Sequence, residues 1–171
     1  MSRLNEFLNI LDKVEGRHSN DPRDRGGETF RGITQKTYNN FCKKMGIPIK
    51  PVSSLSDEEV KYFYQEEIFK NCRFNERIEI HYNYFDCLVN GGSYGHKKIT
   101  EYMNAKILER PMTESEILET LYDFRLKQFK KIAEIYYKTT SINEYPLKGW
   151  INRISKIRAY FNNKKRITNG K

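Results

Sequence analysis

The spacing of apolar side chains predicts a chain built almost entirely of helices. In the segment 4–14, apolar residues recur at intervals of three and four, as on one face of a helix. They are Leu4, Phe7, Leu8, Leu11 and Val14. Similar patterns predict helices over 35–45, 56–70, 82–90, 97–108, 113–138 and 147–161. Strand signals are limited to a short hairpin within 17–30, so the predicted fold class is all-α with a minor irregular β-hairpin.

Capping residues mark several helix starts. Ser56 with Glu59, and Thr113 with Glu116, have the spacing of capping boxes. Thr34 stands directly before the helix predicted over 35–45 and is an N-cap candidate. These local signals fix where three helices begin.

Two helices have apolar faces that predict how they pack. The helix over 113–138 is expected to turn one face inward, formed by Ile117, Leu121, Phe124, Ile132 and Tyr136. Trp150 has the core spacing of the last helix. We therefore interpret Trp150 as a core anchor in preference to a sugar platform.

A glycine-rich segment, 91–95, joins the two middle helices and reads Gly-Gly-Ser-Tyr-Gly. Such a turn lets a glycan or another backbone approach closely, and it is equally consistent with a plain connection between helices. On the first interpretation, Asn90 and Tyr94 are predicted to contact the substrate.

The stretch from Glu15 to Thr34 holds the densest set of candidate catalytic residues. Glu15 falls at the C-terminus of the first predicted helix, where the last free carbonyl groups carry a partial negative charge. This charge is expected to raise the pKa of Glu15, which suits a general acid. The alternative is an ordinary solvated glutamate.

A second carboxylate follows in a segment rich in turn residues, which is expected to double back and bring Asp24 or Asp21 opposite Glu15. Two facing carboxyl groups indicate glycoside hydrolysis, and their separation decides whether the reaction inverts or retains configuration. Thr29 is placed to hold a water molecule. In the alternative reading, Asp24 caps a turn and Thr29 satisfies a loop amide.

The same stretch resembles a known signature. Its members are Glu15-Gly16, 19–22, Asp24, Gly26-Gly27, Thr29 and 32–34. Together they resemble glycoside hydrolase family 108, which groups lysozyme-like N-acetylmuramidases common among phage endolysins. The resemblance continues in 62–64 through 68–69. Phe85-Asp86 with Asn90-Gly91, and then 149–153, are similar to the predicted peptidoglycan-binding region of that family.

The resemblance implies an activity and a layout. The enzyme would cleave the β-1,4 bond between N-acetylmuramic acid and N-acetylglucosamine, with Glu15 as general acid and with Asp24 and Thr29 positioning water or stabilising charge. The implied fold is lysozyme-like, with a cleft between two lobes. Residues 1–75 would be the catalytic region and 76–162 a helical peptidoglycan-binding region packed on it. Residues 163–171 would form a basic tail, expected to fray.

The chain departs from the family pattern at two positions. Arg17 and His18 replace the usual Gly and Tyr after Glu15-Gly16. A cation at Arg17 would favour the ionised form of Glu15 and offset the effect of the helix end. We predict that His18 contacts the sugar; the alternatives are that it tunes Glu15 or that it does neither.

The net charge of +9 predicts an anionic partner. Bacterial peptidoglycan and nucleic acid both satisfy this condition, and the basic C-terminal segment is consistent with either or with a solvated face. The resemblance selects peptidoglycan, so nucleic acid is not expected. Two alternatives stay open: a non-catalytic peptidoglycan-binding or phage structural protein of this fold, and a basic nucleic-acid-binding protein.

The cysteines, the histidines and the N-terminal segment give expectations on thiol state, metal binding and location. The cysteines are Cys42, Cys72 and Cys87, expected to be free thiols in a reducing compartment, and no metal or cofactor is predicted. The amphipathic start resembles neither an export signal nor a membrane span. We therefore expect a monomer made soluble in the cytoplasm, delivered to the wall by a holin or an export system.

Overall fold

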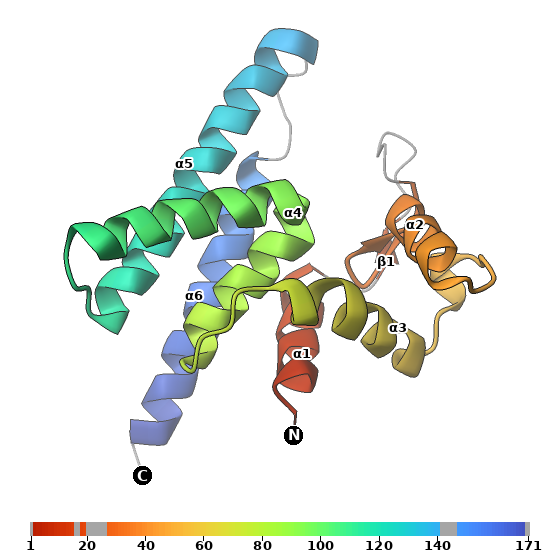
Figure 1. The fold of residues 1–171 in the computed structure, drawn as a ribbon, viewed down its shortest axis with the longest axis horizontal. Coiled ribbons are helices and arrows are strands. Elements are labelled where there is room, and N and C mark those ends of the chain that lie inside the picture. Colours follow the sequence, from red (N-terminus) through yellow and green to blue (C-terminus); the bar gives the residue numbers. More distant parts are fainter. Residues whose placement is uncertain (1, 16–17, 20–26, 141–146, 170–171) are drawn as a thin grey trace. The chain divides into compact units, whose positions relative to one another are not determined.

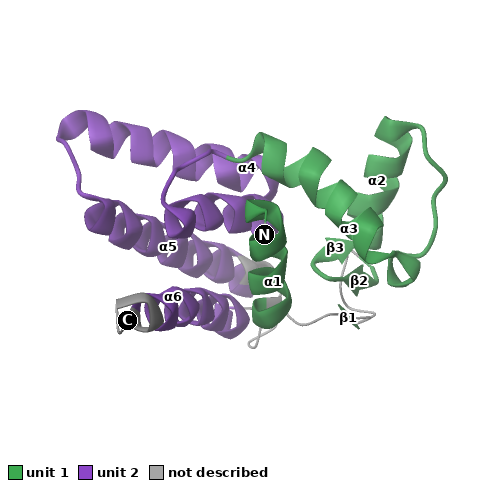
Figure 2. Ribbon diagram, turned by 90° about the horizontal axis from the view of Figure 1, so that it is seen from below, with its two compact units in different colours: residues 1–72 green, residues 73–171 purple. Residues whose placement is uncertain are grey.

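The computed structural model describes residues 2–15, 18–19, 27–140 and 147–169, which form two compact units, Met1–Cys72 and Arg73–Lys171. Figure 1 labels the main elements, and Figure 2 colours the two units separately. Helices dominate both units, which confirms the predicted all-α class with a minor β element. Among the described helices, none is long and apolar enough to cross a membrane.

The described part of the first unit contains three α-helices, a small sheet and short helical turns. They are α1 (Arg3–Glu15), β1 (His18–Ser19), β2 (Thr29–Phe30), β3 (Ile33–Thr34), α2 (Gln35–Met45), the 3₁₀ turn η1 (Val52–Ser54), α3 (Asp57–Phe63), the π-helix η2 (Tyr64–Ile68) and the 3₁₀ turn η3 (Phe69–Asn71). All five apolar residues predicted on the first helix are buried. Helix α1 therefore packs through the expected face.

The sheet is antiparallel in the order β1-β2-β3, so the predicted hairpin gains a third strand. His18 pairs with Phe30, and Thr29 pairs with Thr34 on its other side. The turn between β2 and β3 places Arg31 at φ 49° and Gly32 at φ 79°. Two successive positive φ values are typical of the tight hairpin turns that follow the natural twist of the strands.

The predicted caps of the first unit are confirmed. The Thr34 hydroxyl accepts a hydrogen bond from the Thr37 amide at 3.2 Å, and Ser56 and Glu59 form a complete capping box. The helix predicted over 56–70 is not uniform, because α3 ends at Phe63 and the chain continues as a π-helix and a 3₁₀ turn. No glycine or proline marks this change in the sequence.

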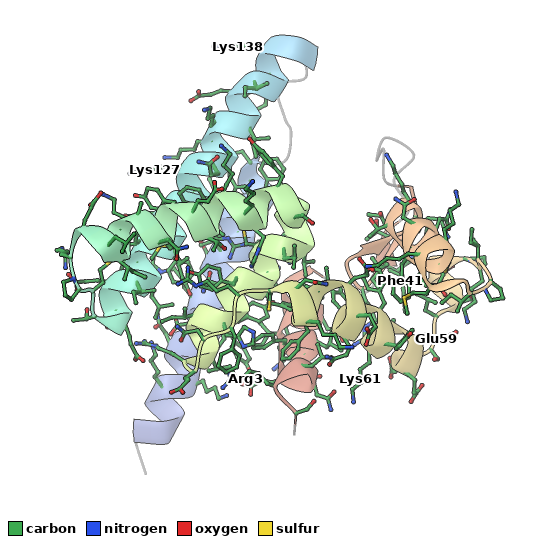
Figure 3. All side chains as sticks on the ribbon, viewed as in Figure 1. Arg3, Phe41, Glu59, Lys61, Lys127 and Lys138 are labelled. Carbon is green, nitrogen blue, oxygen red and sulfur yellow. The ribbon has the colours of Figure 1, made fainter. Side chains whose placement is uncertain are left out.

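Aromatic contacts fill the core of the first unit. Phe41 of α2, labelled in Figure 3, lies 5.1 Å from the Phe63 ring, and Phe63 lies 5.4 Å from the Tyr64 ring. Both contacts are edge-to-face, the favourable arrangement for aromatic rings. These rings join α2 to the segment where α3 gives way to the π-helix.

The second unit consists of α4 (Ile78–Glu109), α5 (Glu114–Thr140) and α6 (Leu147–Asn169). Two helices joined by a five-residue turn were predicted over 82–108; the two helices are present, but the break between them is shorter than the predicted turn. Helix α4 consists of two helical segments that begin at Ile78 and meet at Gly92, whose φ of 59° and ψ of −169° are not helical. One glycine with positive φ suffices to redirect the axis, so the rest of 91–95 keeps its helical conformation.

Helices α5 and α6 confirm most predictions for this region. The Thr113 and Glu116 capping box is present, and Trp150 stacks on Phe129 at 5.0 Å, as a core anchor would. Of the face expected inward on α5, Leu121 is buried and Ile117 and Phe124 are half-buried. Ile132 is 47% exposed, because Ala133 takes the buried position on that turn, and the side chain of Tyr136 lies outside the described residues. Helix α6 extends to Asn169, so the described part of the expected frayed tail is helical.

The thiol prediction is also confirmed. All three cysteines are free, with Cys42 and Cys72 buried and Cys87 half-buried. Burial raises the pKa of the Cys72 thiol to about 11. This thiol therefore stays protonated and poorly nucleophilic at neutral pH.

The capping box at the start of α5 predicts how the stability of the second unit depends on pH. Hydrogen bonds from Arg110 and then from Thr113 lower the pKa of Glu116 to about 2. Because the folded state favours the ionised carboxylate, its stabilising effect is complete above the ordinary pKa near 4.5 and is lost as pH falls toward 2. The variant Glu116→Gln should therefore be less stable than the wild type at neutral pH, with a difference that shrinks in acid.

Urea unfolding followed by the fluorescence of Trp150, the single tryptophan, measures this difference in the second unit. Glu134→Gln, an exposed change of the same charge on α5, is the matched control and should show no such trend. A Glu116→Gln difference that does not vary with pH would contradict the assignment.

Candidate active site

Helix α1 ends at Glu15, so the backbone places this residue at a helix C-terminus as predicted. The side chain of Glu15, together with Arg17, Asp21 and Asp24, lies outside the described residues. The roles given to these residues, and the choice between Asp21 and Asp24, remain predictions.

Thr29 and His18 lie on neighbouring strands of the small sheet. His18 is opposite Phe30, one residue along from Thr29, and successive side chains of a strand point to opposite faces. The register therefore sets Thr29 and His18 on opposite faces of the sheet. The Thr29 hydroxyl donates a long hydrogen bond of 3.4 Å to the Gly27 carbonyl, and its oxygen can still accept a hydrogen bond.

His18 forms a side-chain hydrogen bond that the sequence did not suggest. Its Nε2 atom lies 2.8 Å from Oε1 of Glu28. The hydrogen bond from His18, and then one from Ser53, hold the pKa of Glu28 below its usual value. Glu28 is thus an ionised carboxylate directly before Thr29. The pairing depends on the strand register, which residue spacing alone does not give.

Arg31 makes a second unpredicted contact set, at the turn between β2 and β3. Its guanidinium donates to both carboxylate oxygens of Asp12, each at 2.8 Å, and to Oδ1 of Asp57 at 2.5 Å. The Tyr64 hydroxyl donates to the Arg31 carbonyl at 2.7 Å. We call Arg31 with Asp12 and Asp57 the Arg31 clamp. It joins the last turns of α1, the hairpin and the start of α3.

In the second unit, Asn90 and Tyr94 line the same pocket between α4 and α5. Apolar and aromatic side chains dominate the rest of its lining, notably Phe124, Phe129 and Ile132. Tyr94 is 74% exposed, and Lys98 Nζ lies 5.4 Å from its ring centroid. The structure therefore brings these two predicted substrate residues together and gives them a cation as neighbour.

Two residues that carried the resemblance to a peptidoglycan-binding region are buried in an ionic cluster. Asp86 of α4 binds Arg125 of α5 and Arg153 of α6, the latter at 2.6 Å. Asn83 accepts from Arg125 at 3.0 Å, and Asn90 donates to the Asp86 carbonyl at 3.3 Å. Asp86 and Arg153 therefore hold three helices together and are not available to a ligand.

A solved structure and a protein-family model are similar to this chain. The structure of SagA from Brucella abortus matches with a TM-score of 0.68 at 21% sequence identity, covering 92% of each chain, which shows a shared fold. The comparison with curated proteins gave no match. The family model described as Glycosyl hydrolase 108 matches residues 8–92, a range that contains the end of α1, the sheet and the Arg31 clamp. The chain belongs to the glycosyl hydrolase 108 family.

Proposed function

We propose that this protein is an N-acetylmuramidase that cleaves the β-1,4 bond between N-acetylmuramic acid and N-acetylglucosamine in peptidoglycan. Membership of family 108 makes it a peptidoglycan hydrolase of the lysozyme-like kind. The observation that carries the proposal is that the family match spans 8–92 and includes the helix end at Glu15 and the strand with Thr29.

In the proposed mechanism Glu15 is the general acid. The partial negative charge at the end of α1 favours its protonated form, against the opposing effect expected of Arg17, and the protonated acid would donate to the glycosidic oxygen. Asp24 stabilises the positive charge that develops on the sugar or activates a water molecule, and the Thr29 hydroxyl holds that water. Glu28 is held ionised by His18, so it does not compete for the role of acid.

The second unit is proposed to bind peptidoglycan during catalysis. Arg73–Lys171 contains 19 of the 31 basic residues and 11 of the 22 acidic ones, so it carries most of the net positive charge. Figure 3 labels two of its exposed lysines, Lys127 and Lys138, on α5. In the pocket, the Tyr94 ring would stack on a sugar, and Lys98, which lies over that ring, has no acidic partner among the described residues. Lys98 would pair with a carboxylate of the stem peptide.

This proposal predicts an effect of Tyr94→Ala on binding. In a Glu15→Gln background, which prevents digestion, the affinity for purified sacculi should fall by roughly 3- to 10-fold, the usual effect of losing one aromatic contact. Co-sedimentation of protein with sacculi measures it. Phe74→Ala removes another exposed aromatic of the second unit, outside the pocket, and should bind normally. Equal losses in both variants would argue against a glycan site at Tyr94.

The cleaved bond is tested by digesting purified peptidoglycan, reducing the products with borohydride and identifying the reduced ends by mass spectrometry. Reduced muramic acid ends are expected. Reduced glucosamine ends would make the enzyme a glucosaminidase, and no new ends would favour a non-catalytic wall-binding protein. As a muramidase the chain would serve as a monomeric endolysin, reaching the wall through a holin lesion or an export system.

A further inference from the structure

Arg31 adopts a backbone conformation that is unfavourable for its residue type. Its φ of 49° is positive, and among the described residues it is the one non-glycine with a positive φ. The carbonyl oxygen crowds the Cβ atom in this region, so such turns usually carry Gly, Asn or Asp. A buried arginine here indicates that contacts of its side chain offset the strain.

The side chain links separate elements of the first unit. The Arg31 side chain is 10% exposed. Its planar guanidinium group makes a bidentate contact with Asp12, which lies one turn before the end of α1. Its remaining nitrogen reaches Asp57 in the first turn of α3. A bidentate contact restrains both distance and orientation, which a single ion pair does not.

The carbonyl of the same residue is fixed from another direction. Tyr64, buried at the first position of the π-helix, donates its hydroxyl to that carbonyl. The backbone and the side chain of Arg31 are thus held independently, and the turn has little freedom to shift. π-Helical turns are frequent near functional sites.

These contacts connect the two parts of the proposed active site. Asp12 lies three residues before Glu15, and Arg31 lies two residues after Thr29. Building on the proposed function, we infer that Arg31 is a positioning residue, whose clamp on Asp12 and Asp57 fixes the strand with Thr29 relative to the helix end with Glu15. Because a displacement of about 1 Å can cost on the order of 100-fold in rate, the clamp is expected to act on turnover.

Two variants test the inference. Arg31→Gly removes the side chain but suits the positive φ, so the fold should survive. Its kcat on soluble peptidoglycan fragments should fall by roughly 100-fold with KM nearly unchanged, because the reacting groups are misplaced while the substrate contacts remain. Arg31→Lys keeps the charge without the fork and should recover part of kcat. Asp12→Asn should lower kcat too, and its effect should not add to that of Arg31→Gly.

Leu55→Ala is the matched control for stability. Leu55 is a buried apolar residue of the same unit, so its loss lowers the melting temperature without removing a residue of the clamp. All rates are measured well below every melting temperature. If Leu55→Ala loses kcat as Arg31→Gly does, or if Arg31→Gly turns over normally, the positioning role is wrong. A wild type that releases no fragments would instead overturn the proposed function, and this inference with it.

Discussion

Glu15→Gln is expected to lower the rate of peptidoglycan hydrolysis by roughly 10²- to 10⁴-fold, the range usual for loss of a general acid. The amide has the size of the acid but carries no transferable proton, so the glycosidic oxygen would leave unprotonated. Substrate binding should persist, because the wall contacts proposed at Tyr94 and Lys98 lie in the other unit. The loss should therefore appear in kcat.

The measurement is the release of new reducing ends from purified peptidoglycan, with far-UV circular dichroism as a check on the fold. Glu6→Gln makes the same chemical change in the first turn of α1, away from the proposed acid, and should keep wild-type activity. If Glu15→Gln digests walls at the normal rate, Glu15 is not the acid and the proposed mechanism fails.

The caps were predictable because they depend on residues close in the chain. Thr34, Ser56 and Thr113 each bind an amide three residues ahead, and that spacing is visible in any sequence. The apolar stripe of α1 was predictable for the same reason. Local periodicity specifies which side of a helix is buried, but it does not say what that side packs against.

The extent of the break in α4 and the π-helix after Phe63 could not be predicted, because several residues could adopt the conformation that decides each of them. Three glycines in 91–95 correctly indicated a break between two helices, but the break is confined to Gly92, whose positive φ redirects α4. Gly91 and Gly95 have room around them but stay helical. Likewise, the π-helix after Phe63 has no breaker residue to announce it. It is associated with a tertiary contact, the Tyr64 bond to Arg31, which lies 33 positions away.

The residues of the candidate site also divide into those that the sequence predicted and those that only the fold shows. The position of Glu15 at a helix end followed from apolar spacing, whereas the His18 pair with Glu28 required the strand register. Arg31 lies between short strands and reads as an ordinary loop arginine. Its partners Asp12 and Asp57 belong to two different helices. Only the folded unit shows that one side chain bridges them.

The sequence does carry a sign of the buried ionic cluster. Arg125 lies on the apolar stripe of α5 beside Leu121 and Tyr122, and Asp86 lies within the apolar run that begins at Tyr82. Charged residues on buried faces are rare unless they are paired. The family resemblance at Asp86 suggested peptidoglycan binding, but its burial shows that it reports the packing of three helices.

That burial makes Asp86→Ala the largest expected change in stability. The Asp86 side chain is 0% exposed, and its carboxylate is shared by Arg125 and Arg153. Removing it leaves two buried guanidinium groups without a counter-charge, a loss expected to lower the free energy of unfolding by about 3–5 kcal/mol. Domains of this size are stable by only about 5–15 kcal/mol, so the second unit should unfold in far less urea.

Trp150 fluorescence follows this transition directly, because the single tryptophan packs on Phe129 within the same unit. Glu119→Ala is the control: it breaks the Arg158 pair between the same two helices, α5 and α6, at a solvent-exposed position. That pair should contribute at most about 1 kcal/mol. Replacing Arg125 and Arg153 by Met in the Asp86→Ala chain should restore much of the stability, because no unpaired charge remains. If Asp86→Ala costs no more than Glu119→Ala, the cluster does not hold the three helices together.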